Sequence, residues 1–347
     1  MSHAACNAVA RSWPRTPRSQ DAMQRPGATM PSFRCLGKSA TVRITLIENF
    51  RAVFYTPFYA ALTLRAFADE GIDVELRTSP DPSKTLQQLG ADTVSWGGPM
   101  RLLFNHDRDP ASQNVAFCEA IGRDPFFLIG NSPNANYRPT DLQGKRIAVV
   151  SEVPTPWICL QQDLRLAGLD PKSLQLAPAR TMAENAALLR SGELDVIQVF
   201  QPFAQQLLDE GRGHRWYAAA TRGLSTYTTL NTTRGFIERH PDTVLGMTRA
   251  IFRTLQWLRA HDGATIASRL AEWFPDLSHE TLAACCRTYQ ALDLWNANPV
   301  MQQAGFDWLR DAMQASGDIS RRIPFEECVD MRYAEQAVRE GVPPISG

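Results

Sequence analysis

The sequence lacks the features that would assign it to several common classes of protein. Its 36 basic and 36 acidic residues leave a formal charge of zero, so there is no basic excess to attract nucleic acid or a membrane surface. No stretch approaches the roughly 18 consecutive apolar residues that a membrane-spanning helix needs. We therefore expect no nucleic-acid partner and no transmembrane helix.

Metal-binding patterns are also missing. The seven cysteines are scattered and odd in number, which favours reduced thiols over a disulfide framework. No CxxC motif and no cluster of cysteine and histidine occurs, so we predict neither a metal site nor a cofactor. Cys118, Cys159 and Cys285 lie in apolar stretches and are expected to be small core residues.

Residues 1–40 differ in composition from the rest of the chain. They are rich in Arg, Pro, Ser and Ala without apolar periodicity, which predicts a disordered segment. They also lack the apolar core of roughly 7–15 residues that a secretory signal needs.

The stretch from Glu48 to Leu76 is the most informative part of what is present. Residues 41–47 (TVRITLI) suit a buried strand, residues 60–68 favour a helix that Gly71 ends, and residues 72–76 begin a second strand. The turn between the first strand and the helix is crowded with rings. In a parallel βαβ unit this turn lies at the carboxyl edge of the sheet, where α/β proteins bind ligands. The rings are interpreted as a pocket wall, with core packing as the alternative of equal weight.

Alternating strand and helix patterns continue to about residue 231, as in a doubly wound α/β protein. Residues 131–140 (NSPNANYRPT) are rich in turn formers and are interpreted as a crossing between two lobes. Residues 225–231 are β-prone and are interpreted as the return. Residues 241–318 are mainly helical, beginning with an apolar face of Val244, Met247, Ile251, Leu255 and Leu258.

Five stretches together resemble the SsuA/THI5-like (NMT1-like) family of periplasmic binding proteins. They are FYTPFYAALTLRAFADEGIDVEL, LQQLGADTVSWGGP, DLQGKRIAVV, ALLRSGELDVIQVFQP and FIERHPDTVLGMTRAIFRTLQWL, in the family's order over about residues 41–335. The resemblance implies the two-lobed periplasmic binding protein type II (Venus-flytrap) fold, each lobe a doubly wound sheet flanked by helices. Lobe 1 would hold residues 41–133 and 230–335, lobe 2 residues 134–229, and residues 336–347 would form a tail.

The same resemblance implies a ligand enclosed between the lobes by hinge closure. Helix N-termini at the cleft would donate backbone N–H groups, and Trp96 and Trp157 would sandwich a flat ring. Arg51 could pair with an anion and Glu48 with a ring amine, although a solvated arginine and a salt-bridge carboxylate are the plainer interpretations. The predicted ligand-binding residues are Asn49, Phe50, Arg51, Tyr55, Phe58, Trp96, Gly97, Gly98, Ser151, Val153, Thr155, Trp157, Phe200 and Gln201.

The predicted function is the solute-binding subunit of an ABC importer, monomeric and partnered by a permease and an ATPase. Its aromatic content favours a thiamine-pyrimidine precursor as ligand, with a sulfonate second. The family implies a periplasmic location, and the missing signal leaves a cytoplasmic one open. The alternatives are an enzyme on the same fold, either a THI5-like synthase or a desulfinase, or a ligand sensor. For an enzyme, Cys159 would be the candidate nucleophile, and its burial in the core is the favoured interpretation.

Overall fold

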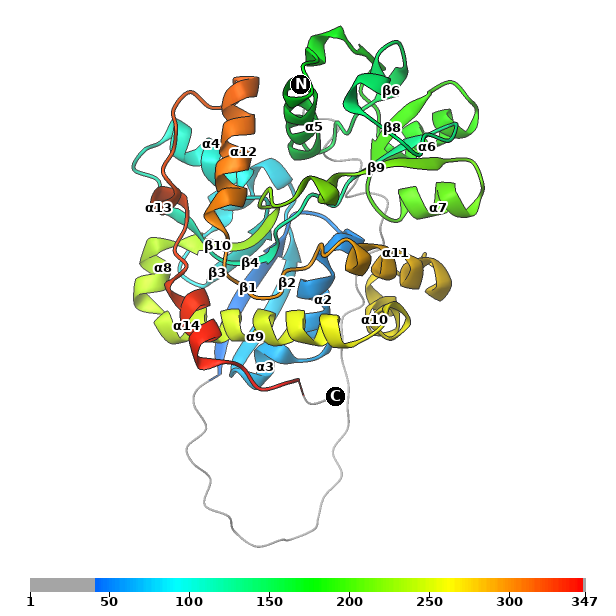
Figure 1. Ribbon diagram of the computed structural model, residues 1–347. Helices are drawn as coiled ribbons and strands as arrows, with labels where there is room; N and C mark the ends of the chain where they lie inside the picture. Colours follow the sequence, from blue (N-terminus) through cyan, green and yellow to red (C-terminus); the bar gives the residue numbers. More distant parts are fainter. Residues whose placement is uncertain (1–40, 346–347) are drawn as a thin grey trace, which may run out of the picture.

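The computed structural model describes residues 41–345 and shows two lobes, each built on a five-stranded sheet (Figure 1). The prediction for residues 1–40 lies outside the described residues. The lobe 1 sheet has the order β2-β1-β3-β10-β4, and its strands are β1 (Val42–Glu48), β2 (Ile72–Thr78), β3 (Thr93–Gly97), β4 (Asn114–Ile121) and β10 (Thr228–Thr233). Strand β1 is parallel to β2 and β3, whereas β10 is antiparallel to β3 and β4.

The lobe 2 sheet has the order β7-β6-β8-β5-β9. Its strands are β5 (Phe127–Gly130), β6 (Arg146–Ala148), β7 (Gln175–Leu176), β8 (Val196–Val199) and β9 (His214–Ala218). Its α-helices are α5 (Thr155–Leu166), α6 (Met182–Arg190) and α7 (Phe203–Asp209). The two-lobed α/β fold predicted from the sequence is therefore confirmed.

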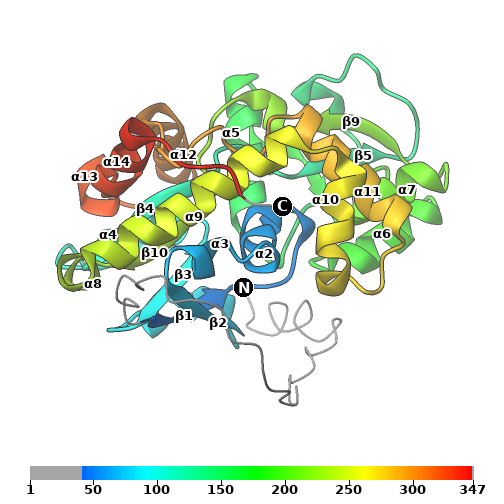
Figure 2. The ribbon, with the colours of Figure 1, turned by 90° about the horizontal axis from the view of Figure 1, so that it is seen from below.

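The helices of lobe 1 come from both ends of the chain. They are α2 (Thr56–Thr63), α3 (Ala66–Asp69), α4 (Met100–Arg108), α8 (Arg234–Arg239), α9 (Pro241–Ala260), α10 (Gly263–Leu270), α11 (His279–Ala291), α12 (Gln303–Ser316), α13 (Phe325–Cys328) and α14 (Arg332–Glu340). Helix α9 crosses the whole of lobe 1 (Figure 2), and the five apolar residues predicted to form its buried face are all buried. No helix among the described residues is long and apolar enough to cross a bilayer.

Short 3₁₀ helices fill the remaining connections: η1 (Val53–Tyr55), η2 (Pro82–Gln88), η3 (Pro139–Leu142), η4 (Pro171–Ser173), η5 (Ala219–Arg222) and η6 (Ala271–Trp273). Side-chain caps begin several helices. Asp81 caps η2, and Thr181 and Glu184 form the capping box that begins α6. Gly71 follows α3 with a φ of 74°, in the left-handed region where glycine carries no penalty.

The first crossing between the lobes lies earlier than the sequence indicates. Strand β5 already belongs to the lobe 2 sheet, so the chain crosses at residues 122–126 and not at residues 131–140. The turn-rich 131–140 segment instead connects β5 to η3 within lobe 2. The second crossing lies between η5 and β10, at residues 223–227. The predicted tail also begins too early, because α14 continues to Glu340 and buries Ala337.

Candidate functional site

The aromatic turn after β1 is packed into the core of lobe 1. Trp96, at the end of β3, is 0% exposed and stacks on Phe58 with ring centroids 4.7 Å apart and planes within 7°. Tyr55 and Tyr59 close its edges at 5.9 and 5.6 Å. Phe58 thus occupies a face of Trp96 that a ligand would need, and core packing is the interpretation that the structure supports for these rings.

Trp157 lies in the first turn of α5 and belongs to a different core. It packs against a buried cluster of lobe 2 that includes Leu142, Leu160 and Leu164. The predicted sandwich of Trp96 and Trp157 is therefore corrected, because each ring is held by its own lobe.

Three phenylalanines form an apolar contact between the lobes. Phe200 follows β8 in lobe 2, and its ring stacks on Phe50 at 6.3 Å and meets the edge of Phe54 at 5.5 Å, both from lobe 1. Phe126 of the first crossing adds an edge contact to Phe200 at 5.2 Å. The three rings form an aromatic wall whose members come from both lobes and from the first crossing, whereas a ligand pocket at these rings remains a prediction.

Glu48 and Arg51 neutralise one another beside this wall. The Arg51 guanidinium donates to the Glu48 carboxylate at 2.8 Å, and the Tyr59 and Thr78 hydroxyls donate to it at 2.7 and 2.8 Å. Arg51 also lies over the rings of Tyr59 and Trp273, at 5.3 and 5.1 Å. Burial and the nearby carboxylate raise the pKa of Tyr59 well above its usual value. This arrangement favours the salt-bridge interpretation over ligand binding by either group.

The turn after β3 is built differently, around Gly97 and the amide of Asn49. Asn49 is buried, and its Oδ1 accepts a hydrogen bond from the Thr85 hydroxyl at 2.6 Å. Its Nδ2 has no hydrogen-bond partner. A Cβ at Gly97 would lie 2.3 Å from that Nδ2, so a larger residue there would displace the Asn49 amide. A buried N–H group without a partner is costly, which makes this amide a candidate donor to a bound acceptor.

Gly98 marks the point where both lobes and the second crossing converge. A Cβ on this glycine would lie 3.4 Å from the Tyr227 carbonyl, 3.8 Å from Arg101 Nη1 and 3.8 Å from Thr155 Oγ1. Tyr227 belongs to the crossing, Arg101 to the first turn of α4 in lobe 1, and Thr155 to the first turn of α5 in lobe 2. The Thr155 hydroxyl also reaches Met100 Sδ at 3.3 Å. The two lobes therefore meet here through Gly98, the Thr155 hydroxyl and the Arg101 guanidinium.

Arg101 and Tyr227 were missed in the sequence prediction. Arg101 Nε donates to the Pro82 carbonyl at 2.8 Å, which fixes the base of the guanidinium. Burial raises the pKa of Tyr55 to about 12, while Arg101 and Asn49 act on that hydroxyl in the opposite direction. Asn49, Tyr55 and Arg101 thus form one polar group. A cation three residues after the glycine pair, in the first turn of a helix at the sheet edge, is the signal that could have revealed Arg101.

The predicted residues of lobe 2 divide into two groups. Val153, which precedes α5, and Thr155, its first residue, are buried, whereas the Ser151 hydroxyl donates to the Arg180 carbonyl within lobe 2. Gln201 accepts at its Oε1 from the Gln205 N–H at 2.8 Å, which caps the start of α7. The structure thus places each of the predicted residues, and their role in ligand binding remains a prediction.

The described cysteines do not resemble activated nucleophiles. All five are buried, and burial raises the pKa of Cys159 well above its usual value and that of Cys286 to about 12. A catalytic thiolate needs a lowered pKa. Among residues 41–345, no group of three or more His, Cys, Asp and Glu side chains could hold a metal ion.

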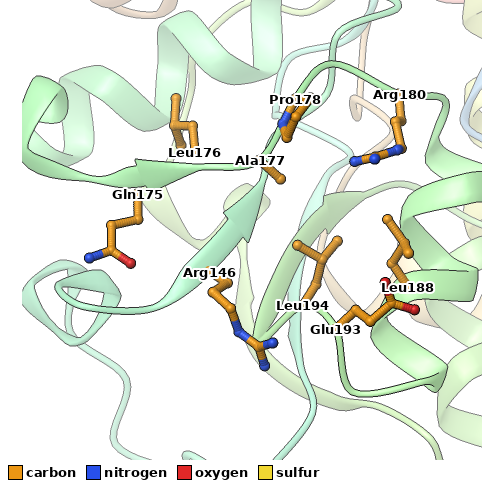
Figure 3. A pocket seen from close by; sticks show the side chains of 9 residues that line it. All are labelled: Arg146, Gln175, Leu176, Ala177, Pro178, Arg180, Leu188, Glu193 and Leu194. Carbon is orange, nitrogen blue, oxygen red and sulfur yellow. The ribbon is translucent and has the colours of Figure 1, made fainter.

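A separate hollow lies on lobe 2, between β7 and α6 (Figure 3). Its volume is about 300 Å³, and its lining includes Arg146, Arg180 and Leu188. The Arg146 guanidinium pairs with Asp195 at 2.7 Å. This hollow shares no lining residue with the region around Gly98.

Comparison with known proteins gives three informative relatives. A protein of Bacillus subtilis strain 168, YtlA, which is named as a binding protein, is 23% identical over 313 residues, covering 88% of this chain and 93% of that one. The alkanesulfonate-binding protein SsuA of Xanthomonas axonopodis pv. citri, solved with MOPS, is 15% identical with a TM-score of 0.64, covering 84% of this chain and 99% of its own. The desulfurization enzyme DSZB is 14% identical with a TM-score of 0.62, covering 86% and 99%.

A family model matches part of the chain. Residues 129–273, which extend from lobe 2 through the second crossing and α9, match the NMT1-like family. This match, together with the fold shared by the SsuA-type structures, supports the predicted resemblance to the SsuA/NMT1-like family.

Proposed function

We propose that this protein is the solute-binding component of an ABC-type importer and that it encloses a small ligand between its lobes. The convergence at Gly98 carries the proposal. Arg101 of lobe 1, Thr155 of lobe 2 and the Tyr227 carbonyl of the second crossing all lie close to Gly98. A molecule bound there contacts both lobes and the crossing, which are the parts that hinge closure moves. Two similar proteins, YtlA and SsuA, are named as binding proteins, and a similar structure from Staphylococcus aureus is described as the ligand-binding component of an ABC-type import system. These names support the same function.

The chemistry around Gly98 favours an organic anion as ligand. Arg101 supplies a cation, and Asn49 Nδ2 supplies a buried N–H without a partner. Phe50, which follows Asn49 in the chain, stacks on Phe200 of lobe 2 and so brings apolar rings to the contact between the lobes. A sulfonate or carboxylate head with an apolar body matches these groups, because charge-assisted hydrogen bonds to Arg are the strong ones.

The thiamine-pyrimidine precursor, favoured by the sequence, is the less well supported choice. A ring amine needs an acceptor, and the nearby carboxylate of Glu48 already accepts from Arg51, Tyr59 and Thr78. We therefore place a sulfonate-like ligand first. An import function further implies a permease and an ATPase as partners and a location on the outer face of the membrane.

A thermal-shift screen of alkanesulfonates, arylsulfonates, aromatic carboxylates and pyrimidines tests this proposal. A ligand at about 100 times its Kd stabilises a protein by about 2.7 kcal/mol, which is a measurable rise in Tm. Incubation of each hit with the protein then shows whether it is held unchanged or converted. Conversion would identify an enzyme, and binding only by pyrimidines would overturn the anion assignment.

Arg101→Gln tests the predicted contact directly. We expect it to weaken binding of the sulfonate hit at least tenfold, about 1.4 kcal/mol, in isothermal titration calorimetry. Arg108→Gln is the matched control, because Arg108 ends the same helix and is exposed. Equal affinity in both variants would remove Arg101 from the site.

A further inference from the structure

Three segments of the chain meet where the lobes are joined. The two crossings are hydrogen-bonded to one another, with the Ser225 N–H donating to the Gly122 carbonyl and the Tyr227 N–H to the Ile121 carbonyl, each at 2.9 Å. The segment between α11 and α12 joins them, since the Asn296 N–H donates to the Ala120 carbonyl at 3.0 Å. Any rotation of one lobe against the other must be absorbed by these few residues.

The carboxylate of Glu119 links all three segments. Glu119 lies near the end of β4 and is 1% exposed. Its Oε1 accepts from the Thr226 hydroxyl of the second crossing, and its Oε2 accepts from Asn296 Nδ2 at 2.8 Å. Gly122 makes room for this arrangement, because a Cβ there would lie 2.7 Å from Asn296 Oδ1 and 3.2 Å from Glu119 Oε2.

Thr226 is held in a backbone conformation that threonine rarely adopts. Its φ is 40°, in the left-handed region where a β-branched residue is strained. Such a conformation persists only when its surroundings hold it. The bond to Glu119 is one such restraint, and the start of α12 is another, since a Cβ on Gly305 would lie 3.2 Å from the Thr226 nitrogen.

We infer that the Glu119 carboxylate is a proton-sensitive tether that holds the second crossing and so sets the freedom of the two lobes to rotate. The inference goes beyond the proposed function, because it concerns the hinge and holds whichever ligand the protein binds. An ionised carboxylate accepts from both Thr226 and Asn296. A protonated carboxyl accepts more weakly and carries an O–H that donates, so the Thr226 hydroxyl turns to accept or its bond to Glu119 weakens.

The surroundings of Glu119 support a change in the protonation of its carboxylate near neutral pH. Burial raises the pKa of Glu119 to about 7, although the hydrogen bonds from Thr226 and Asn296 act to lower it. The ionisable groups on the segments joined around it include Cys118 on β4, Arg123 and Asp124 on the first crossing, Arg222 at the end of η5, Tyr227 on the second crossing, and Asp293 and Asp307 on either side of the Asn296 segment. The helices α4, α9, α13 and α14, which pack against β4, carry further ionisable groups, among them His106, Glu327 and Arg332. Arg222 is paired with Asp124 and Asp163, Asp293 with Arg259, and Asp307 with Arg310.

Small-angle X-ray scattering of the full chain without ligand, from pH 5.5 to 8.5, tests this inference. We expect the radius of gyration to rise as the pH falls, with a midpoint near 7. Glu119→Gln should abolish the transition, because the amide always donates and cannot ionise. Hydrogen exchange at the Ser225 and Tyr227 amides, corrected for its intrinsic pH dependence, should show the same transition locally.

Two substitutions at Thr226 keep the test decisive if Glu119→Gln fails to fold. Thr226→Val removes the donor and keeps the branched side chain, so it should move the midpoint to higher pH. Thr226→Ser keeps the donor and should titrate like the unmodified protein. A radius that is constant over this range, or a Thr226→Val midpoint equal to that of Thr226→Ser, would overturn the tether. No ligand is added, so failure here is independent of the proposed transport function.

Discussion

The turns after β1 and β3 lie at the same edge of the lobe 1 sheet but are built in opposite ways. In the β1 turn, Phe58 stacks on Trp96 and the one arginine pairs with Glu48. The β3 turn has two glycines, and its Gly97 faces the unpartnered amide nitrogen of Asn49, the first residue after β1, while Arg101 lies near Gly98. In our proposal the rings of the first turn serve stability and the second turn serves binding, although the first is far more conspicuous in the sequence.

Among the tests of this comparison, Trp96→Ala has the largest expected effect, and it acts on stability. Removing a fully buried tryptophan should lower the free energy of unfolding by about 4 kcal/mol, because the transfer term and the cavity term add. Urea denaturation measures this loss. Trp157→Ala is the matched control, and we expect a smaller loss there because Trp157 is only partly buried. Comparable stability in the two variants would show that Trp96 is not the core residue described above.

Glu48→Gln tests the ion pair of the β1 turn. It leaves the Arg51 charge largely buried without its carboxylate, which should cost about 3 kcal/mol of unfolding free energy. Glu75→Gln, which removes a carboxylate paired with Arg43 at the surface, should cost less than about 1 kcal/mol. If Glu48→Gln instead abolished ligand binding at unchanged stability, Glu48 would belong to the binding site.

Local patterns were sufficient to predict most of the elements. The β-branched run before Glu48 forms β1, and the apolar face beginning at Val244 forms α9, because each pattern reports burial directly. The first crossing could not be located in the same way. Nothing in the composition of residues 127–130 indicates which sheet they join, since that depends on pairing with β8 and β9, far along the chain.

The residues that meet at Gly98 were only partly among the predicted binding residues. The glycine pair was selected because glycines allow a tight turn and close backbone approach, and Thr155 because its hydroxyl could donate a hydrogen bond. Arg101 was missed because an arginine in a helix is usually solvated, and only the fold brings it to Gly98. Glu119 carried no signal at all, since its partners Thr226 and Asn296 lie 107 and 177 residues away.

Alanine at each of the two glycines gives the finest comparison, within the β3 turn itself. At Gly97 the new Cβ would lie 2.3 Å from Asn49 Nδ2, so the amide must leave Thr85, and the unfolding free energy should fall by about 2 kcal/mol. At Gly98 all neighbours lie at ordinary contact distances of 3.4 Å or more. Gly98→Ala should therefore change stability by less than about 0.5 kcal/mol.

The two variants should rank in the opposite order when their affinity for the ligand is measured. The Gly98 methyl group would occupy the space between Arg101, Thr155 and Tyr227, so Gly98→Ala should weaken the screened ligand at least tenfold by calorimetry. Unchanged affinity in a stable Gly98→Ala variant would show that the ligand lies elsewhere. A Gly97→Ala variant as stable as the parent would show that Asn49 adapts, and would weaken the argument that its amide is positioned for a ligand.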